Sequence, residues 1–328
     1  MKILFVFTGG TIGSTLDGNY ISVDAKKPYL LLERYAENEK LPDFDTAEPY
    51  TALSEHNTGS ELSALIACVR ENISSYDGII ITHGTDTLQY TAAALSYAFG
   101  SCTPPICLVS SNFPIEHPQA NGLANLRAAI AFIRQGGGNG VFVMYQNQTD
   151  ARVSVHRGTR LLASHAFSDA VFSVHNCPFG WISSENARFL PNPTYHESPD
   201  AVKPFAVTDL PAACPQILRI VPYVGFQYPS ISQEIRYILH ESYHSGTINT
   251  RTESARAFFV DAKCRKIPVF LTGVSGGASY ASAKDFTELS ILPLPPITPI
   301  AAFLKLWFCA ETGADAKKIM FLPLGGDF

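Results

Sequence analysis

The sequence has 328 residues, of which 46% are hydrophobic and 16% charged, so the chain can form a large core and is not disordered. Its formal net charge is −5 and it has no long run of lysine or arginine, which argues against a nucleic-acid partner. A small polar ligand, uncharged or zwitterionic, fits this composition better.

The apolar start spans five residues, too few for the core of a signal peptide or for a membrane span. We therefore expect a cytoplasmic protein with no membrane contact. The seven cysteines are an odd number and none forms a C-x-x-C pair, which predicts free thiols and no zinc site. We expect neither a metal nor a cofactor.

The first predicted element is a buried strand from Ile3 to Phe7, because a short apolar run that ends abruptly at two glycines is typical of a parallel sheet. The loop after it reads Thr8-Gly9-Gly10-Thr11-Ile12-Gly13. Ligand sites of open α/β sheets form outside the carboxyl ends of the strands, so the hydroxyls of Thr8 and Thr11 are candidate functional groups.

A turn follows at Asp17-Gly18-Asn19-Tyr20, and its loop could carry the hydroxyl of Tyr20 onto a ligand. The alternative is a surface turn with Tyr20 packed on its rim. Pro49 to Leu53 predicts a short edge strand that delivers Ser54-Glu55-His56-Asn57 to a loop, and helical spacing follows from Glu61 to Val69.

The second strand and loop of this kind are Gly78 to Ile81 and Thr82-His83-Gly84-Thr85-Asp86-Thr87. The helix expected behind that loop has a regular apolar face formed by Leu88, Ala92, Leu95 and Phe99. Further strands at 106–110 and 140–145 flank a helix with Leu123, Leu126 and Ile130 on one face. Strands that alternate with amphipathic helices predict a doubly wound, mostly parallel sheet.

Six of the chain's 22 prolines lie between Pro191 and Pro215, which indicates an interdomain linker. Beyond it we expect strands at 217–224 and 267–271, a helix at 253–264, and a helix that begins at Thr298-Pro299. The predicted fold is therefore an α/β fold with a larger N-terminal doubly wound domain (1–190), a linker (191–215) and a smaller C-terminal α/β domain (216–328).

Glycine-rich loops after strands can bind phosphate through main-chain N–H groups, but neither G-x-G-x-x-G nor G-K-[S/T] is present. Together, Thr8-Gly9-Gly10-Thr11-Ile12-Gly13 and His83-Gly84-Thr85-Asp86-Thr87 resemble the two signature motifs of bacterial-type L-asparaginases, closer to the cytoplasmic type. The resemblance spans most of the chain, and the order, spacing and strand context of both motifs agree with it.

The resemblance implies that Thr11 is the nucleophile and that Thr85 and Asp86 are catalytic and substrate-binding residues. Tyr20 matches the tyrosine of the family's mobile loop, and Ser54 matches the residue that binds the substrate's α-carboxylate. Asp86 would then meet the α-ammonium. A threonine nucleophile and main-chain donors for the oxyanion are what the hydrolysis of a side-chain amide requires.

Two further residues are expected at the substrate. Gly84 lies in the second motif, whose main-chain N–H groups can serve the oxyanion. Glu55 stands where the family has glutamine or serine, and its carboxylate either favours the ligand's ammonium over its α-carboxylate or points to solvent. Asn121 and Asn125 match a helix start of the family, for which we expect helix capping and backbone support for the site.

The family's proton acceptor is a lysine, and the alignment through Arg157-Gly158-Thr159-Arg160 places Ala163 at its position. A shifted register would place His156 there instead, with a poorer match downstream. Since alanine cannot transfer a proton, His156 or His165 substitutes, a water chain does the work, or the protein is an inactive or binding relative.

The leading hypothesis is hydrolysis of L-asparagine, with L-glutamine as a second substrate, by a homodimer or homotetramer, since the family completes its sites between subunits. The match to the family's dimer turn at Ser245-Gly246-Thr247-Ile248-Asn249 is loose. One rival is a non-catalytic amino-acid-binding relative. Another is a component of an amidotransferase that acts on aminoacyl-tRNA, which requires an added N-terminal domain and a basic surface that we do not expect here.

Overall fold

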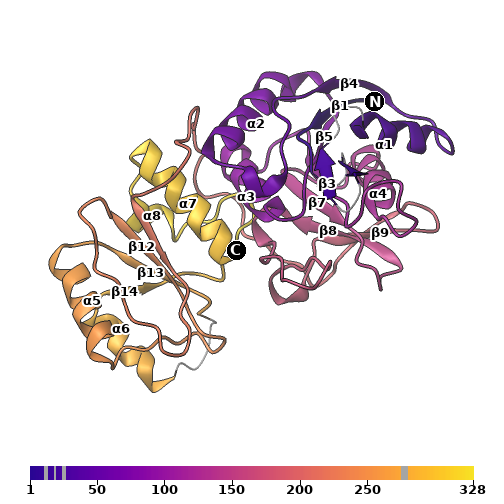
Figure 1. The fold of residues 1–328 in the computed structure, drawn as a ribbon. Coiled ribbons are helices and arrows are strands. Elements are labelled where there is room, and N and C mark those ends of the chain that lie inside the picture. Colours follow the sequence, from indigo (N-terminus) through magenta and orange to yellow (C-terminus); the bar gives the residue numbers. More distant parts are fainter. Residues whose placement is uncertain (11–13, 18–19, 24–26, 275–279) are drawn as a thin grey trace.

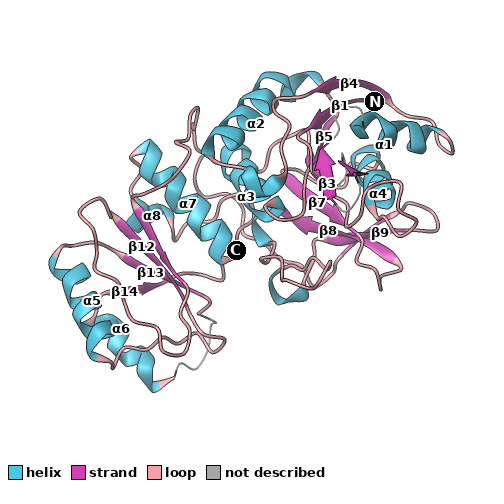
Figure 2. Cartoon of the chain, in the orientation of Figure 1, coloured by secondary structure: helices cyan, strands magenta, loops and turns pink. Residues whose placement is uncertain are grey.

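The structure is a computed structural model that describes the chain apart from residues 11–13, 18–19, 24–26 and 275–279; the side chains of residues 11–28 also lie outside the description. Figure 1 shows two groups of strands, with helix α7 (Pro299–Thr312) between them. Strands and helices alternate along most of the chain (Figure 2). The predicted α/β class is confirmed.

The larger sheet has the strand order β10-β9-β8-β7-β6-β5-β1-β4. Its parallel strands are β4 (Asp43–Ala47), β1 (Lys2–Phe7), β5 (Gly78–Thr82), β6 (Ile106–Val109) and β7 (Val141–Tyr145). Antiparallel strands extend it: β8 (Arg152–Arg157), β9 (Gly180–Ser183) and β10 (Phe189–Pro191). A separate hairpin consists of β2 (Ser14–Asp17) and β3 (Tyr20–Val23).

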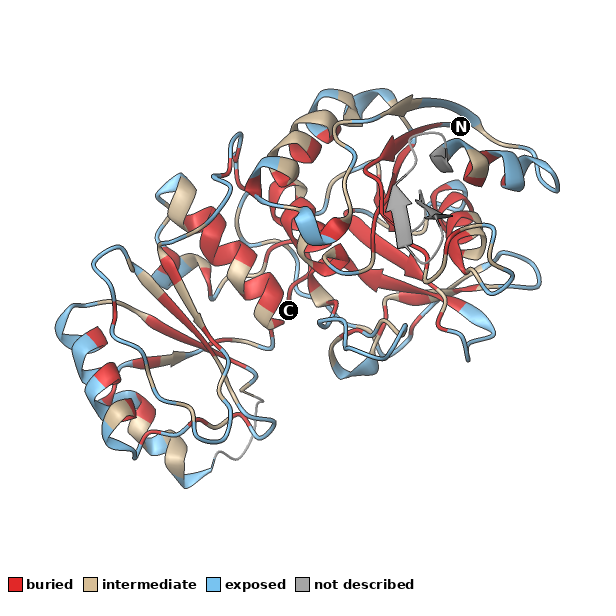
Figure 3. Ribbon diagram, viewed as in Figure 1, coloured by how far each residue is buried: buried red, intermediate tan, exposed pale blue. Residues whose placement is uncertain are grey.

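Helices cover both faces of this sheet, as a doubly wound fold requires. Core residues of α1 (Lys27–Ala36) and α4 (Gly122–Arg134) pack with Phe5 and Phe7 of β1 on one face. Those of α2 (Gly59–Asn72), α3 (Leu88–Phe99) and α7 pack with Leu4 and Val6 on the other. The central strands are therefore buried on both sides, which explains their continuous apolar sequences (Figure 3).

The strand order places β1 and β5 at the point where the winding of the sheet reverses. The chain goes from β1 outward to β4 and then crosses back to β5, β6 and β7. Crossovers that leave two neighbouring strands in opposite directions open a crevice at their carboxyl ends, where ligands of such folds bind. Both sequence motifs follow these two strands.

The smaller sheet is parallel, with the order β11 (Ile217–Ile220), β12 (Tyr237–Glu241), β13 (Val269–Thr272) and β14 (Ile291–Pro293). Helices α5 (Glu253–Cys264) and α6 (Asp285–Glu288) cover one face and share a core with Ile238 and Leu271. Helix α7 covers the other face and also packs against α3. Its predicted start is confirmed, since the hydroxyl of Thr298 accepts from the Ala301 N–H at 3.1 Å.

Two predicted strands differ from the structure. Residues 49–53 form no strand; a single bridge joins Ala52 to Gly9, because β4 already occupies the neighbouring edge of β1 and Pro49 lacks an N–H. Strand β11 ends at Ile220 rather than at residue 224.

The proline-rich stretch packs against the larger sheet's helices. The N–H of Phe205 donates to the carbonyl of Tyr97 on α3 at 2.9 Å, and the N–H of Leu210 donates to Ser63 on α2 at 2.7 Å. Phe205 and Leu210 are both buried. The domain boundaries themselves stay a prediction.

Candidate active site

Three loops touch at the carboxyl ends of β1 and β5. A methyl group on Gly10 would collide with the main-chain nitrogen of Gly84, and one on Gly84 would lie 2.5 Å from the hydroxyl of Ser54. Gly10 also has a φ of +78°, which disfavours any side chain there. The N–H of Gly10 donates to the carbonyl of Ala52 at 3.1 Å, which fixes the third loop to the first.

The side chains of Ser54 and Asp86 lie together at this junction. The Ser54 hydroxyl donates to Oδ2 of Asp86 over 3.4 Å, and the hydroxyl of Thr87 donates to the Ser54 carbonyl at 2.9 Å. Ser54 is buried, whereas Asp86 is exposed. One carboxylate and one hydroxyl are therefore adjacent at this junction, next to Gly84, which carries no side chain.

The structure describes some of the remaining predicted residues and not others. Thr85 is half-buried, and its carbonyl accepts from the hydroxyl of Ser164 at 3.5 Å, while Glu55 is exposed beside Ser54. Thr11 lies outside the described residues, and so does the side chain of Tyr20. Thr8 is buried and donates to the carbonyl of Thr82 at 2.7 Å, so its hydroxyl joins β1 to β5.

His83, for which the sequence predicted no role, forms the back wall of the site. Its Nδ1 donates to the Gly84 carbonyl at 2.7 Å, so Nε2 is left to accept from Thr91 at 2.8 Å and from Asn57 at 3.2 Å. Burial lowers the pKa of His83 to about 4, which keeps the ring neutral and preserves this pattern. Asn57 follows Ser54 in a loop and Thr91 lies on α3, and neither gave a sequence signal, because their common partner His83 belongs to a third segment.

Asn121 and Asn125 support the neighbouring strand ends. The side-chain oxygen of Asn121 accepts from the Asn112 N–H at 3.0 Å and its amide donates to the Gln146 carbonyl at 2.8 Å, so its side chain does not cap α4, contrary to our expectation. Asn125 donates to the carbonyl of Ser110 and accepts from the N–H of Gln146, both at 2.8 Å. The loops after β6 and β7 are thus tied together.

The two candidate replacement bases differ in their surroundings. His156 is buried on β8, where Nδ1 bonds to the hydroxyl of Ser173 at 2.8 Å, and burial lowers its pKa to about 4. His165 is exposed, and its carbonyl accepts from the Ser168 N–H at 3.3 Å. Ala163 is exposed next to Ser164, the residue that contacts Thr85.

In the part of the chain that the structure describes, neither a metal-binding cluster nor a membrane-spanning helix is found. No group of three or more His, Cys, Asp or Glu side chains is arranged to hold a metal ion. Among the helices within those same ranges, none combines the length and the apolar composition that a membrane crossing requires.

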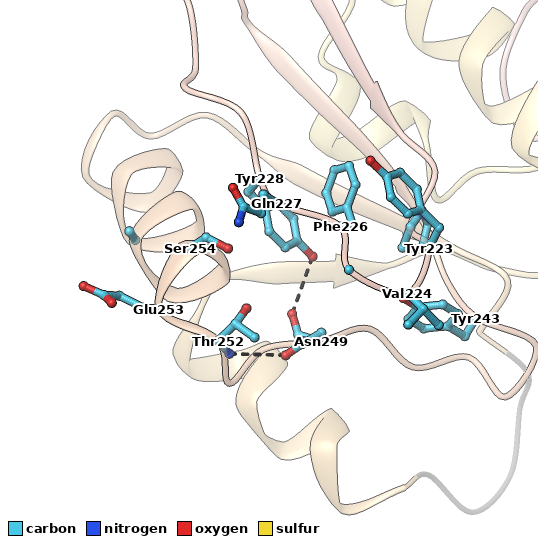
Figure 4. A pocket seen from close by; sticks show the side chains of 13 residues that line it. Tyr223, Val224, Phe226, Gln227, Tyr228, Tyr243, Asn249, Thr252, Glu253 and Ser254 are labelled. Atoms are coloured by element: carbon cyan, nitrogen blue, oxygen red, sulfur yellow. Dashed lines mark hydrogen bonds between the residues drawn. The ribbon is translucent and has the colours of Figure 1, made fainter.

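A cavity of about 890 Å³ lies beside the smaller sheet, lined by the loops after β11 and β12 and by the start of α5. Figure 4 shows Tyr223, Phe226 and Tyr228 around it, with Glu253 pointing away from these rings. The hydroxyl of Tyr228 bonds to Nε2 of His240 at 2.8 Å and to the Asn249 carbonyl at 3.5 Å. None of the residues that line this cavity belongs to the three loops of the junction.

Comparison with known proteins agrees with this arrangement. The family model described as "Asparaginase, N-terminal" matches residues 2–195. The L-asparaginase of Thermococcus kodakarensis is 26% identical over 345 residues, which cover 100% of this chain and 99% of that protein. One component of the glutamyl-tRNA(Gln) amidotransferase of Pyrobaculum aerophilum is 28% identical over 346 residues, covering 98% of this chain and 79% of that protein.

Solved structures show the same fold over the whole chain. The thermostable L-asparaginase from Thermococcus kodakarensis has a TM-score of 0.81 at 24% identity and covers 100% of this chain and 99% of its own. L-asparaginase I from Vibrio cholerae has a TM-score of 0.74 at 23% identity. The match covers 100% of this chain and 98% of that structure's chain. The two sheets and their connections are therefore those of these structures.

Proposed function

Because the chain belongs to the asparaginase family, we propose that it hydrolyses L-asparagine to L-aspartate and ammonia, and that L-glutamine is its second substrate. The observation that carries this proposal is the contact of Gly10, Gly84 and Ser54. It joins the two motif loops and the predicted carboxylate-binding loop at the sheet's reversal point, where ligands of such folds bind. The L-asparaginase of Thermococcus kodakarensis, similar over the full chain, supports the choice of amide.

The proposed reaction has two steps. Thr11, which follows Gly10 in the chain, attacks the side-chain amide carbon through its hydroxyl oxygen, and main-chain N–H groups near Gly84 stabilise the oxyanion of the tetrahedral intermediate. The C–N bond breaks, the leaving nitrogen takes a proton, and ammonia departs from an acyl-enzyme. Water then attacks the ester carbon and releases L-aspartate, which restores the Thr11 hydroxyl.

The other predicted residues bind and enclose the substrate in this proposal. Ser54 binds the α-carboxylate, Asp86 binds the α-ammonium, and Tyr20 closes the loop over both. The exposed carboxylate of Glu55 adds negative charge next to Ser54, which favours the ammonium end of an amino acid over its carboxylate end. Thr85 completes the set through the proton transfer that its family position implies.

Ala163 leaves this mechanism with a vacant proton acceptor, and the alternative proposal is an amino-acid-binding relative that does not turn over. The two differ in one measurement. Under the hydrolase proposal, L-asparagine gives ammonia in proportion to enzyme and time. Under the alternative, L-asparagine and L-aspartate raise the melting temperature, but no ammonia appears over hours.

The decisive test of the hydrolase proposal is Thr11→Val, assayed for ammonia release with L-asparagine. We expect activity to fall by at least about 10³-fold, as removal of a nucleophile does, with an unchanged melting temperature. Thr51→Val is the matched control, because Thr51 is exposed on the neighbouring loop. Unchanged turnover in Thr11→Val removes this threonine from the mechanism.

A second candidate function is favoured by the relatives that belong to glutamyl-tRNA(Gln) amidotransferases, of which the Pyrobaculum protein is 28% identical over 98% of this chain. In that case, ammonia release by the purified chain would depend on an aminoacyl-tRNA and on a second protein. Turnover of free L-asparagine by the purified chain alone contradicts this candidate.

We further propose that the protein is a cytoplasmic homodimer or homotetramer. Bulky apolar residues of the smaller sheet's loops stand in solvent in the single chain: Tyr223 is 62% exposed and Val224 is 98% exposed. Such residues are typical of surfaces that a partner covers. Light scattering of the purified chain should give two or four times the 35.7 kDa of one chain.

A further inference from the structure

A second polar cavity, of about 360 Å³, lies on strand β8. Side chains alternate between the two faces of a strand, so Arg152, Ser154 and His156 lie in a row on one face and line this cavity. Trp181 of β9, which pairs with Ser154 in the sheet, forms the side of the cavity. Its volume is in the range of small-molecule sites.

Two polar groups of this row make no hydrogen bond to the described part of the chain. Ser154 lines the cavity, and its hydroxyl has no hydrogen-bond partner among the described residues. Nε2 of His156 is buried and has no partner in the described part of the chain. A buried polar group without a partner costs free energy, so such groups gather where a ligand or water completes them.

The guanidinium of Arg152, on the same strand face as Ser154, is a cation without a counter-charge among the described residues. The guanidinium of Arg152 lies over the ring of Trp181, with its central carbon 4.6 Å from the ring centroid, and within the described ranges it has neither an ion pair nor a hydrogen bond. Stacking holds the guanidinium plane and leaves its N–H edge free. In contrast, the amide of Asn147, which also lines the cavity, is occupied by both main-chain groups of Val171.

We propose that this cavity binds the carboxylate of a small organic acid, with the Arg152 guanidinium and the Ser154 hydroxyl as its donors. A carboxylate accepts from a guanidinium edge and a hydroxyl at once. Val171, Phe172 and Pro178 also line the cavity and supply an apolar wall for the body of the ligand. Asp150 lines it too and adds a like charge that weakens binding of an anion.

This site is separate from the proposed active site. Strands β7 and β6 lie between β8 and β5, so the cavity is about 14 Å across the sheet from the strand that carries the second motif. None of its lining residues belongs to the three loops of the active-site junction. The proposal therefore stands or fails independently of asparagine hydrolysis.

The test is isothermal titration calorimetry of the purified full chain with benzoate and with its neutral isostere benzamide. We expect benzoate to bind at least about tenfold more tightly, because only the carboxylate pairs with Arg152. Equal affinity for the two probes overturns the proposal. Inorganic phosphate is the third probe, and binding as tight as that of benzoate would show a general anion site instead of an organic-acid site.

Substitutions in the cavity test whether benzoate binds there. Arg152→Gln should weaken benzoate binding at least about fivefold and Ser154→Ala about two- to fivefold, whereas Arg188→Gln, an exposed arginine on the same sheet's edge, should change nothing. Circular dichroism melting checks that each variant folds. Unaltered affinity in both cavity variants places benzoate elsewhere and overturns the proposal.

Asp150→Asn, titrated with benzoate, tests whether the probe's carboxylate lies near Asp150. For an anion, removal of the carboxylate should tighten binding about two- to threefold, because a like charge is lost. Weaker binding in Asp150→Asn therefore contradicts the organic-acid proposal.

Discussion

Ala163 is the residue on which the proposed chemistry depends most. It is exposed, and the next residue, Ser164, donates to the carbonyl of Thr85 at 3.5 Å. The backbone at Ala163 therefore passes the second motif, so a long side chain placed there could reach the opening beside Asp86. This proximity supports the alignment that gives the family's lysine position to Ala163.

Ala163→Lys should increase ammonia release from L-asparagine, because an amine near Thr85 and Asp86 supplies the missing proton acceptor. General base catalysis contributes about 10²- to 10⁴-fold in rate, so we expect a gain of at least about tenfold even with imperfect geometry. Initial rates across pH 6 to 9 measure it, and the gain should increase as the lysine loses its proton.

The control for that experiment is Ala166→Lys, which adds the same amine to an exposed position in the same segment. It should leave the rate unchanged. A gain of equal size in both variants would trace the effect to surface charge. No gain in Ala163→Lys, with an intact melting temperature, would mean that the register is wrong.

Among the elements, those with strong local signals were predictable from the sequence. Strands β1 and β5 are buried on both faces, so each gives an uninterrupted apolar run that ends at a glycine loop. Strand β8 was not among the predicted elements, although the alternation of Arg152, Ser154 and His156 with two valines is typical of a strand. Its antiparallel pairing with β7 depends on a long-range register that no local pattern encodes.

Within the candidate site, too, some residues were predictable from the sequence and others were not. The meeting of Gly10 and Gly84 was anticipated because loops at the carboxyl ends of strands converge, whereas Ser54 was expected there only from the family resemblance. The role of His83 could not be anticipated, since its neutral form depends on burial and on partners from two other segments. Asn121 was misread for a related reason: its side chain finds tertiary partners instead of its own helix.

Helix α7 carries an ion pair that no solvent reaches. Nζ of Lys305 lies 2.7 Å from Oδ2 of Asp327 and donates to the Leu322 carbonyl at 2.6 Å, and both charged side chains are 0% exposed. Tyr97 of α3 also donates to Asp327 at 3.2 Å. The pair therefore fastens the last residues of the chain to the two helices that join the sheets.

Lys305→Met should destabilise the fold by about 3–5 kcal/mol, because it leaves the Asp327 carboxylate buried without its counter-charge. Urea unfolding followed by circular dichroism measures the change. Lys305→Met with Asp327→Asn should recover most of the loss. Lys318→Met, an exposed lysine on the neighbouring helix α8 (Ala316–Ile319), should cost less than about 0.5 kcal/mol. A loss no larger in Lys305→Met than in this control would contradict the argument.

At the scale of the whole molecule, three buried histidines make stability depend on pH. Burial lowers the pKa of His83, His156 and His240 to about 4. The unfolded chain therefore binds protons at these positions below about pH 6.5, whereas the folded chain does not. The free energy of unfolding that these neutral histidines contribute is therefore fully present above about pH 6.5. It is lost as the pH falls toward about 4.

His240→Gln tests this dependence away from the proposed active site. The ring donates through Nδ1 to the Glu241 carbonyl at 2.6 Å and accepts from Tyr228 at 2.8 Å, contacts that an amide can partly replace. From pH 7 to pH 5, one such histidine should cost about 2 kcal/mol of unfolding free energy. We expect His240→Gln to be less stable at pH 7 but to lose about 2 kcal/mol less than the unaltered chain on acidification. His196→Gln, at an exposed histidine, should keep the full loss. Equal losses in His240→Gln and the unaltered chain would mean that His240 is already protonated in the fold at pH 5, which contradicts the lowered pKa.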